Sequence, residues 1–133
     1  MDRETFTQPE WWQTHDEFHL SPALRVGKDL YLSGHTGEPE HDPETQMRDA
    51  FEDVTRSLAL AGATWSDVVS VTSYHVGLRE HLDTIVSVHN EFVTTPPYPT
   101  WTGIGVTELT NGSIIEVVVV ARLPDAEADV APP

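Results

Sequence analysis

The segment Ser113–Leu123 reads SIIEVVVVARL, and it restricts the possible folds of this chain more than any other stretch. Apolar residues stand at both odd and even positions, which is typical of a β-strand that is buried on both faces. Glu116 is the exception, and a period of two places it on one face with Val118 and Val120. Both faces of the sheet that contains this strand must therefore be covered.

Two upstream segments predict amphipathic helices. Asp42 and Pro43 form an N-cap followed by a proline at the first helical position, and Gly62 follows the expected end of this helix. A second helix is predicted over residues 80–93. The apolar positions at helical spacing are Met47, Phe51, Val54 and Leu58 in the first helix, and Leu82, Ile85, Val86, His89 and Phe92 or Val93 in the second.

The remaining patterns predict strands. Residues 24–26 and 30–33 read as one hairpin, residues 67–77 as a single strand, and residues 101–109 and 113–122 as a second hairpin closed at Asn111-Gly112. We expect residues 1–20 to be irregular, residues 35–42 to be a loop and residues 124–133 to fray. The chain therefore predicts one α+β domain over residues 1–133, a mixed sheet with two helices on one face.

Two helices can cover only one face of such a sheet. The apolar character of residues 113–123 on both faces requires a second cover. Another copy of the same chain is the simplest one, so we expect a homo-oligomer.

The charge of the chain excludes several classes of partner. Seven Lys and Arg residues face 22 Asp and Glu residues, for a net charge of −15, so nucleic acid and anionic lipid should be repelled. Such acidity is typical either of life at high salt or simply of a highly soluble surface. There is no cysteine, no apolar run that could span a membrane and no signal-peptide pattern, and we expect a cytoplasmic protein.

Glu116 has two explanations. A carboxylate on a buried strand is costly unless it is paired, hydrated or protonated. Glu116 could point into a wet gap between subunits, or pair with an arginine, without a chemical role. Alternatively, it holds a water molecule or moves a proton in a reaction.

The segment PPYPTWTGIGV raises a related question about Trp101. Alternation places Trp101, Gly103 and Gly105 on one face of the strand, and Ile104 and Val106 on the other. We expect the two aliphatic residues to face the helices. Trp101 should then form the wall of a hollow on the face that a second copy covers.

Between Ser21 and Leu123 the chain resembles the Rid/YjgF family of reactive-intermediate deaminases. The resemblance depends on the order and spacing of SPALRVGKDLYLSG, DAFEDVTRSLALAGATWSDVVSVTSYHV, VHNEF, YPTWTGIGVTEL and IIEVVVVA. It implies a trimer with a central β-barrel, and ligand sites in the clefts between subunits. It also implies hydrolysis of 2-imino or enamine acids to 2-keto acids and ammonia, without a cofactor.

The resemblance also implies site residues. Glu116 matches the catalytic glutamate that orients water. Ser33, Gly34 and Asn90 match substrate-binding positions, and Leu20 replaces a tyrosine that closes the pocket. Trp101 falls where the family has the arginine that grips a substrate carboxylate.

The loss of this arginine changes the expected ligand. An indole cannot replace a bidentate cation, so Trp101 should favour a neutral, aromatic or cationic ligand over a small imino acid. We predict a Rid-like hydrolase or deaminase with altered substrate choice. The alternative is a small-molecule-binding or interaction protein without catalysis.

Other polar residues are weaker candidates. His35 follows Ser33-Gly34 and could face the cleft, or it could lie on the surface of a loop. Gly103 is a candidate substrate-binding residue, and His75 could line the barrel. His89 reads as a core or edge histidine. His15 and His19 have a zinc-like spacing, but no third ligand is evident, so we predict no metal site.

Overall fold

The structure is a computed structural model that describes residues 2–124. Its sheet has seven strands in the order β1-β2-β3-β7-β5-β6, with β4 paired to β7. The strands are β1 (Arg3–Phe6), β2 (Ala23–Val26), β3 (Asp29–Leu32), β4 (His35–Thr36), β5 (Val68–Val76), β6 (Thr100–Val106) and β7 (Ile115–Arg122). The helices are α1 (Trp12–Phe18), α2 (Pro43–Leu60) and α3 (Leu82–Phe92), with 3₁₀ turns η1 (Pro9–Trp11) and η2 (Trp65–Asp67).

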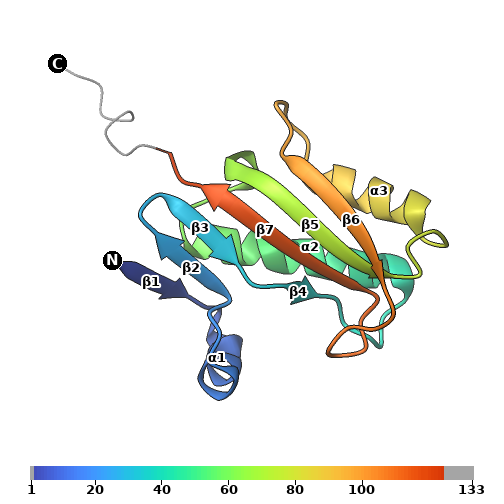
Figure 1. The fold of residues 1–133 in the computed structure, drawn as a ribbon, viewed down its shortest axis with the longest axis horizontal. Coiled ribbons are helices and arrows are strands. Elements are labelled where there is room, and N and C mark those ends of the chain that lie inside the picture. Colours follow the sequence, from blue (N-terminus) through green and yellow to red (C-terminus); the bar gives the residue numbers. More distant parts are fainter. Residues whose placement is uncertain (1, 125–133) are drawn as a thin grey trace.

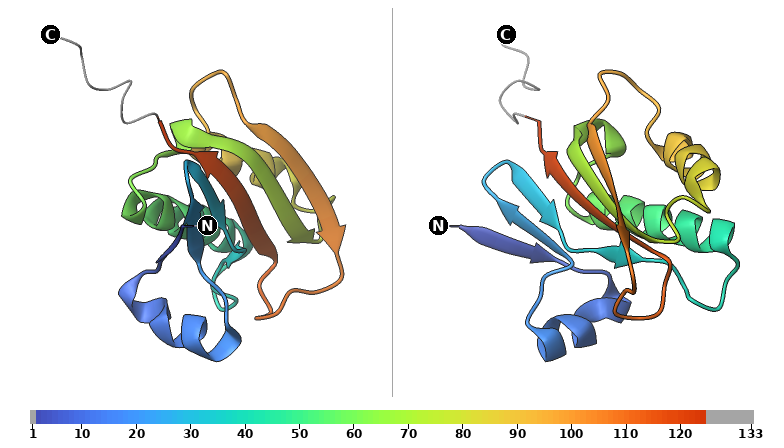
Figure 2. Two further views of the ribbon diagram at one scale, coloured as in Figure 1. Left: turned by 60° about the vertical axis from the view of Figure 1, so that its left-hand side comes forward. Right: turned by 45° about the vertical axis from the view of Figure 1, so that its right-hand side comes forward.

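The predicted fold class is confirmed. Helices α2 and α3 lie together behind one face of the mixed sheet, and β7 lies at its centre (Figures 1 and 2). The core fills the space between this face and the two helices. Ile115, Val117 and Val119 of β7 are fully buried there.

Helix α2 begins and ends where the sequence indicates. The Asp42 side chain accepts a hydrogen bond from the Thr45 amide at 2.9 Å, and Pro43 is the first helical residue. The four apolar positions predicted for this helix are all buried. This helix is long enough, and regular enough in pattern, for local rules to determine it.

Helix α3 agrees in place but differs in its buried stripe. Ile85, Val88 and His89 are buried, whereas Leu82 and Val86, which we predicted to be buried, are 48% and 38% exposed. The helix lies near the edge of the sheet, so only a narrow stripe meets the core. The pattern of apolar residues alone is too broad to define that stripe.

The predicted second hairpin is wrong. Strands β6 and β7 do not pair with each other, because β5 lies between them, parallel to β6 and antiparallel to β7. A turn does form at Gly112, whose φ is 82°, and the Asn111 side chain bonds the Ser113 amide. The loop that carries this turn crosses the end of β5 instead of closing a hairpin, which only long-range strand pairing could decide.

The N-terminal arm is more ordered than the sequence suggests. Strand β1 pairs with β2, and α1 projects from the lower edge of the sheet in Figure 1. Trp11 packs edge-on against the buried His35 ring, with the ring centroids 5.2 Å apart. The predicted fraying of residues 124–133 falls, apart from Pro124, outside the described residues.

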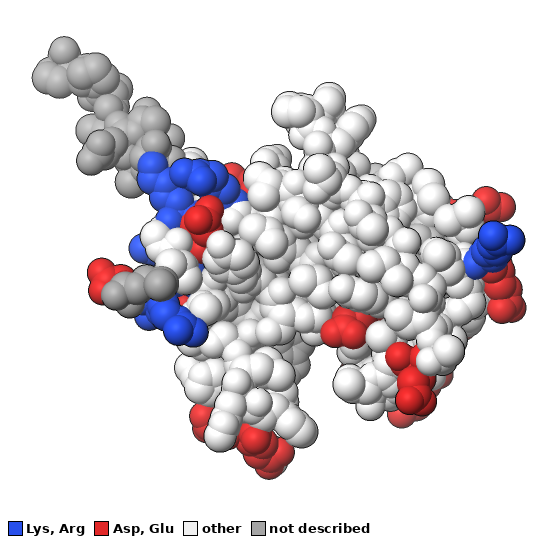
Figure 3. Space-filling view, in the orientation of Figure 1, with Lys and Arg blue, Asp and Glu red and all other residues white. Residues whose placement is uncertain are grey.

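The second face of the sheet has no helix over it in the described part of the chain (Figure 2). We call it the open face; it carries Tyr74, Ile104, Glu116 and Val118. Figure 3 shows a surface that is mostly uncharged over β5, β6 and β7, with acidic groups toward its lower and right-hand edges. Glu116 is the one acidic residue within these three strands.

Candidate functional site

Glu116 lies on the open face, as its position in the alternating pattern predicts. It pairs with Thr36 of β4 on one side and with Tyr74 of β5 on the other, and Tyr74 in turn pairs with Ile104. The side chain is half-buried. Among the described residues, no hydrogen bond or ion pair holds its carboxylate, so its oxygens are free to bind water or a ligand.

Gly34 makes room for this carboxylate. The strand is interrupted at Ser33-Gly34, between β3 and β4, and the Glu116 side chain lies against the Gly34 backbone. A Cβ atom at position 34 would stand 1.8 Å from Glu116 Oε1, so a larger residue would force the Glu116 side chain to move. Glycine is therefore needed here for close approach.

Ser33 and Leu20 lie next to the same place. The Ser33 amide and hydroxyl donate hydrogen bonds to the carbonyls of Pro22 and Ser21, at 3.0 and 2.7 Å. These bonds hold the segment that contains Leu20, which is 36% exposed, beside the Ser33-Gly34 interruption. Ser33, Gly34 and Glu116 thus form one group, which we call the Glu116 cluster, and Leu20 directly precedes the Ser21 that Ser33 bonds.

Trp101 lies on the opposite face, so our prediction of its orientation is wrong. Strand β6 runs parallel to β5 in a register that pairs Trp101 with Val71 and Gly103 with Ser73, both of which face the helices. Ile104, expected in the core, is on the open face and 38% exposed. Because β6 is an edge strand, its apolar residues did not have to point toward the helices.

Two contacts fix the Trp101 ring. It stacks on the imidazole of His89 from α3, with the ring centroids 3.7 Å apart and the planes 3° from parallel. Its indole N–H donates to Ser73 Oγ at 2.9 Å. The only donor of this side chain is therefore already used within the protein.

A pocket of about 530 Å³ opens beside this stack. We call it the Trp101 pocket. It is lined by His89, Asn90, Val93, Thr94, Tyr98, Pro99 and Trp101. Asn90 is at the exposed end of α3 and its side-chain oxygen is 2.8 Å from His89 Nδ1, so the predicted residues Asn90 and Trp101 come together here.

Two buried histidines adjoin the Trp101 ring: His89, which lines the pocket, and His75, which is linked to Trp101 through Ser73. Ser73 Oγ is also 2.7 Å from Nε2 of His75, which faces the helices and does not lie on the open face. Burial lowers the pKa of His75 to about 4, and burial also lowers the pKa of His89. Both rings are therefore neutral near pH 7.

His35 is not a pocket residue. It is 4% exposed and faces α2, where its ring nitrogens lie 2.7 Å from Ser57 Oγ and from the Ser33 carbonyl oxygen. The prediction that it faces the cleft is wrong, because the strand β4 that carries it pairs with β7 and turns its side chain inward. Gly103 lies on the helix side beside Ser73.

The sequence did not identify His89, Ser73 and Tyr98 as site residues. His89 was assigned to the apolar stripe of its helix, which is correct but incomplete. Tyr98, 64% exposed in the loop after α3, carried no signal in the sequence, because single exposed aromatic residues are common on protein surfaces.

The Glu116 cluster and the Trp101 pocket lie on opposite faces of the sheet. One chain therefore does not bring Glu116 and Trp101 to the same ligand. Within the described residues no group of three or more His, Cys, Asp or Glu side chains could hold a metal ion. No described helix is both long and apolar enough to cross a membrane.

Comparisons with known proteins agree on the family. The RutC family protein YjgH of Escherichia coli strain K12 is 40% identical over 114 residues, which cover 82% of this chain and 86% of that protein. The family model described as Endoribonuclease L-PSP matches residues 14–123. The chain belongs to the Rid/YjgF family.

Solved structures of the family have the same fold. A structure of protein YjgH covers 94% of this chain and 99% of its own, with a TM-score of 0.84 and 35% identity. A YjgF-family protein from Mycobacterium tuberculosis covers 92% and 100%, with a TM-score of 0.81 and 25% identity. Rid/YjgF membership is consistent with a role of the deaminase or hydrolase type on small molecules.

Proposed function

We propose that this Rid/YjgF protein hydrolyses a reactive imine or enamine of a small molecule, without a cofactor, in clefts between the subunits of a homotrimer. The observation that carries the proposal is the Glu116 carboxylate, which rests on Gly34 and has no protein partner among the described residues. A carboxylate in this state can accept a proton from water. Its position on an uncovered face keeps it within reach of a ligand.

The reaction follows from these groups. Glu116 takes a proton from water while the oxygen attacks the imine carbon, and the C=N bond becomes a C–N single bond. The proton then passes to the nitrogen and gives an amino alcohol. Glu116 next takes the hydroxyl proton and returns it to the amine, the C–N bond breaks, and ammonia leaves as the C=O bond forms. The balance is one imine and one water to one carbonyl compound and one ammonia, with no change of oxidation state.

A trimer would complete the site. Because the Glu116 cluster and the Trp101 pocket lie on opposite faces, they can act on one ligand only if they come from neighbouring chains. The open face supports such packing, since it carries few charged residues over β5, β6 and β7 (Figure 3).

We further propose that small 2-imino acids are poor substrates. The Trp101 indole N–H is held by Ser73, so it cannot bind a substrate carboxylate in place of the arginine that the family resemblance implies at this position. A lost charge-assisted contact in a desolvated site costs about 2–5 kcal/mol. We expect kcat/KM for iminopropionate to be reduced by about 30-fold or more relative to an arginine-bearing relative.

The family description also contains the word endoribonuclease, but the charge of this chain opposes RNA as its substrate. RNA is a polyanion, and a protein with a net charge of −15 would repel it. The chain has only seven Lys and Arg residues to oppose this charge, and Arg48, Arg56 and Arg122 already pair with acidic side chains. A binding protein without catalysis, in which Glu116 only holds a ligand, is the second candidate.

Glu116→Gln tests the proposal, because it preserves shape and removes the base. Imines are generated in solution by oxidation of amino acids or of amines that lack a carboxylate. Their hydrolysis is measured above the spontaneous rate. We expect turnover to fall by about 10²–10⁴-fold with the fold and assembly unchanged. Glu52→Gln, an exposed glutamate of α2, is the control and should behave as the native protein.

The two candidates give different results. If turnover is present and Glu116→Gln leaves it intact, the proposed role of Glu116 is wrong. If no imine in the panel is hydrolysed, yet Glu116→Gln changes ligand affinity, the binding protein is the better description.

A further inference from the structure

The Trp101 pocket offers a ligand no charge. Among the described residues, its lining contains no Lys, Arg, Asp or Glu. His89, which forms part of the lining, is 6% exposed and has a pKa lowered by burial, so its ring is neutral at physiological pH. Neither a carboxylate nor an ammonium group would find an opposite charge among these side chains.

Glu91, the charged residue that adjoins the pocket lining in sequence, is paired with Arg48. Arg48 of α2 donates to Glu91 at 2.6 and 3.2 Å, and to Glu44 at 3.3 Å. Glu91 follows Asn90 directly at the end of α3, beside the pocket. Because this guanidinium and this carboxylate form a two-point pair, neither is free to hold a charged ligand.

The stack of Trp101 on His89 gives the pocket a rigid flat wall. The parallel rings are 3.7 Å apart, the indole N–H is held by Ser73, and Phe51 packs edge-on against His89 with the centroids 5.9 Å apart. Tyr98 adds a second, exposed aromatic ring to the lining. Flat rings are preferred partners of such walls because offset stacking adds to simple burial.

The remaining polar groups are neutral. Asn90 presents an exposed amide, and among the described residues no donor reaches His89 Nε2, which is buried. The pocket volume of about 530 Å³ lies within the range that small-molecule sites have in proteins. It is large enough for one ring and a short substituent.

We infer that the Trp101 pocket binds a neutral, flat, conjugated group, such as an aromatic ring, of the compound that Glu116 of a neighbouring chain hydrolyses. This inference rests on the proposed function for the statement that the ligand is a substrate. It names the substrate class as a neutral aryl imine or enamine. A carboxylate next to the ring would find no cation in this lining. An ammonium group would be attracted by the aromatic rings, but it would lose its hydration without a carboxylate to replace it, so we expect it to bind less well than a neutral group.

Three probes of nearly equal shape test the inference: benzamide, benzoate and benzylammonium. Binding to the full-length protein is measured by calorimetry in about 0.5 M salt, which screens the long-range field of the acidic surface. We expect benzamide to bind about ten-fold or more tightly than either ion. Equal or tighter binding of benzoate or benzylammonium to the native protein would overturn the inference.

Three variants show whether the probes bind in the Trp101 pocket. Trp101→Arg should weaken benzamide binding and invert the preference toward benzoate, whereas Trp101→Phe keeps a neutral ring and should keep the native order. Leu82→Arg adds the same charge at an exposed position of α3 outside the pocket and should leave the order unchanged. If Leu82→Arg inverts the preference as Trp101→Arg does, the binding is not in the Trp101 pocket.

The outcome is independent of turnover. If the probes fail to follow the expected order but Glu116-dependent hydrolysis is found, only the inference about the pocket falls. If the probes follow the order and no imine is hydrolysed, the proposed reaction falls and the pocket remains a site for neutral aromatic ligands.

Discussion

At the scale of single residues, the site depends on contacts between groups that are far apart in the sequence. The absence of a side chain at Gly34 leaves room for the Glu116 carboxylate, and the Ser73 hydroxyl accepts the hydrogen bond of the Trp101 indole. Neither contact can be recognised from the neighbouring residues in the sequence. Both involve small residues, because close approach requires the absence of side-chain atoms.

Gly34→Ala should reduce turnover by displacing Glu116. The three atoms nearest to the added Cβ all belong to the Glu116 side chain, which can rotate away, so the fold should survive. We expect a fall in kcat comparable to that of Glu116→Gln. In the Glu116→Gln background, Gly34→Ala should then cost little more, because the two changes remove one function. Fully additive losses in this double-mutant cycle would contradict the assignment.

His75 should make stability depend on pH. Its pKa is lowered by burial from about 6.5 to about 4, so the folded chain binds fewer protons than the unfolded chain within that window. The stability it contributes is present above pH 6.5 and is lost as the pH falls toward 4, by up to about 3 kcal/mol.

Urea unfolding at fixed protein concentration, at pH 7.5 and at pH 5, measures this effect. His75→Gln should flatten the pH dependence, whereas the control His41→Gln should not. The pKa of the exposed His41 is raised by its bond to Asp49, so it acts in the opposite direction. An equally steep loss in His75→Gln would assign the effect to other groups, such as His35.

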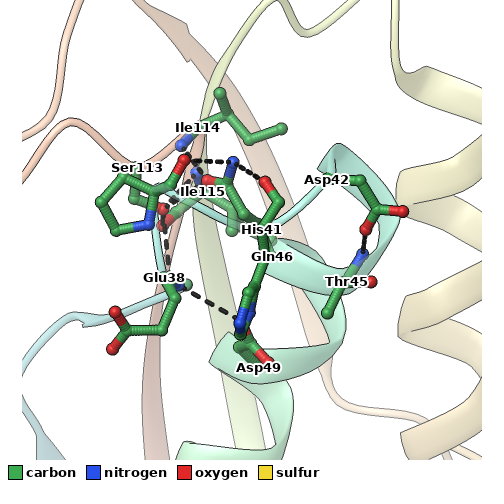
Figure 4. A network of polar contacts seen from close by, with 11 residues as sticks. Glu38, His41, Asp42, Thr45, Gln46, Asp49, Ser113, Ile114 and Ile115 are labelled. Atoms are coloured by element: carbon green, nitrogen blue, oxygen red, sulfur yellow. Dashed lines mark hydrogen bonds and ion pairs between the residues drawn. The ribbon is translucent and has the colours of Figure 1, made fainter.

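At the scale of elements, one side chain joins α2 to two loops. Gln46, 5% exposed, donates to the His41 carbonyl at 2.8 Å and accepts from the Ile114 amide at 3.1 Å (Figure 4). It thereby ties the segment before α2, and the loop before β7, to the first turns of the helix. Gly37 packs directly on the Gln46 backbone and completes this junction.

Gln46→Ala should destabilise the protein by about 1–3 kcal/mol, because it removes the partners of two part-buried backbone groups. The control is Gln13→Ala on α1, an exposed glutamine whose amide bonds only Glu17. It should cost less than about 0.5 kcal/mol. Denaturant midpoints measure both, and a similar cost for the two variants would mean that solvent replaces the Gln46 bonds.

At the scale of the whole molecule, the open face is the feature that a single chain leaves unfinished. Val118 and Val120 of β7 are only half-buried there, and Tyr31 and Ile104 are exposed. The four side chains form an apolar surface on the same face as Glu116. Assembly would bury this surface and bring the two halves of the proposed site together.

We expect light scattering to give a stable homotrimer at micromolar concentration. Val118→Lys places a charge in the middle of the open face and should dissociate the trimer and abolish turnover. Leu60→Lys makes the same kind of change at an exposed position of α2 and should leave the assembly intact. A native monomer at this concentration, or a trimeric Val118→Lys variant, would contradict the proposed assembly.

The sequence by itself determined the elements whose signals are local and strong. The capped helix α2, the central strand β7 and the turn at Gly112 follow from spacing, capping and turn chemistry. The face of Glu116 follows from alternation, because β7 lies at the centre of the sheet and its buried face is fixed by the helices. The family and the fold class were also within reach of the sequence.

The tertiary structure decided what depends on strand pairing. The face of the sheet to which Trp101 points depends on whether β6 pairs with β5 or with β7. The sequence pattern of β6 is compatible with either pairing. The edge position of β6 removes the burial constraint that made alternation reliable in β7. For the same reason His35, on a two-residue strand, turned inward to Ser57, and the stack of Trp101 on His89 could be seen only once α3 and β6 were placed side by side.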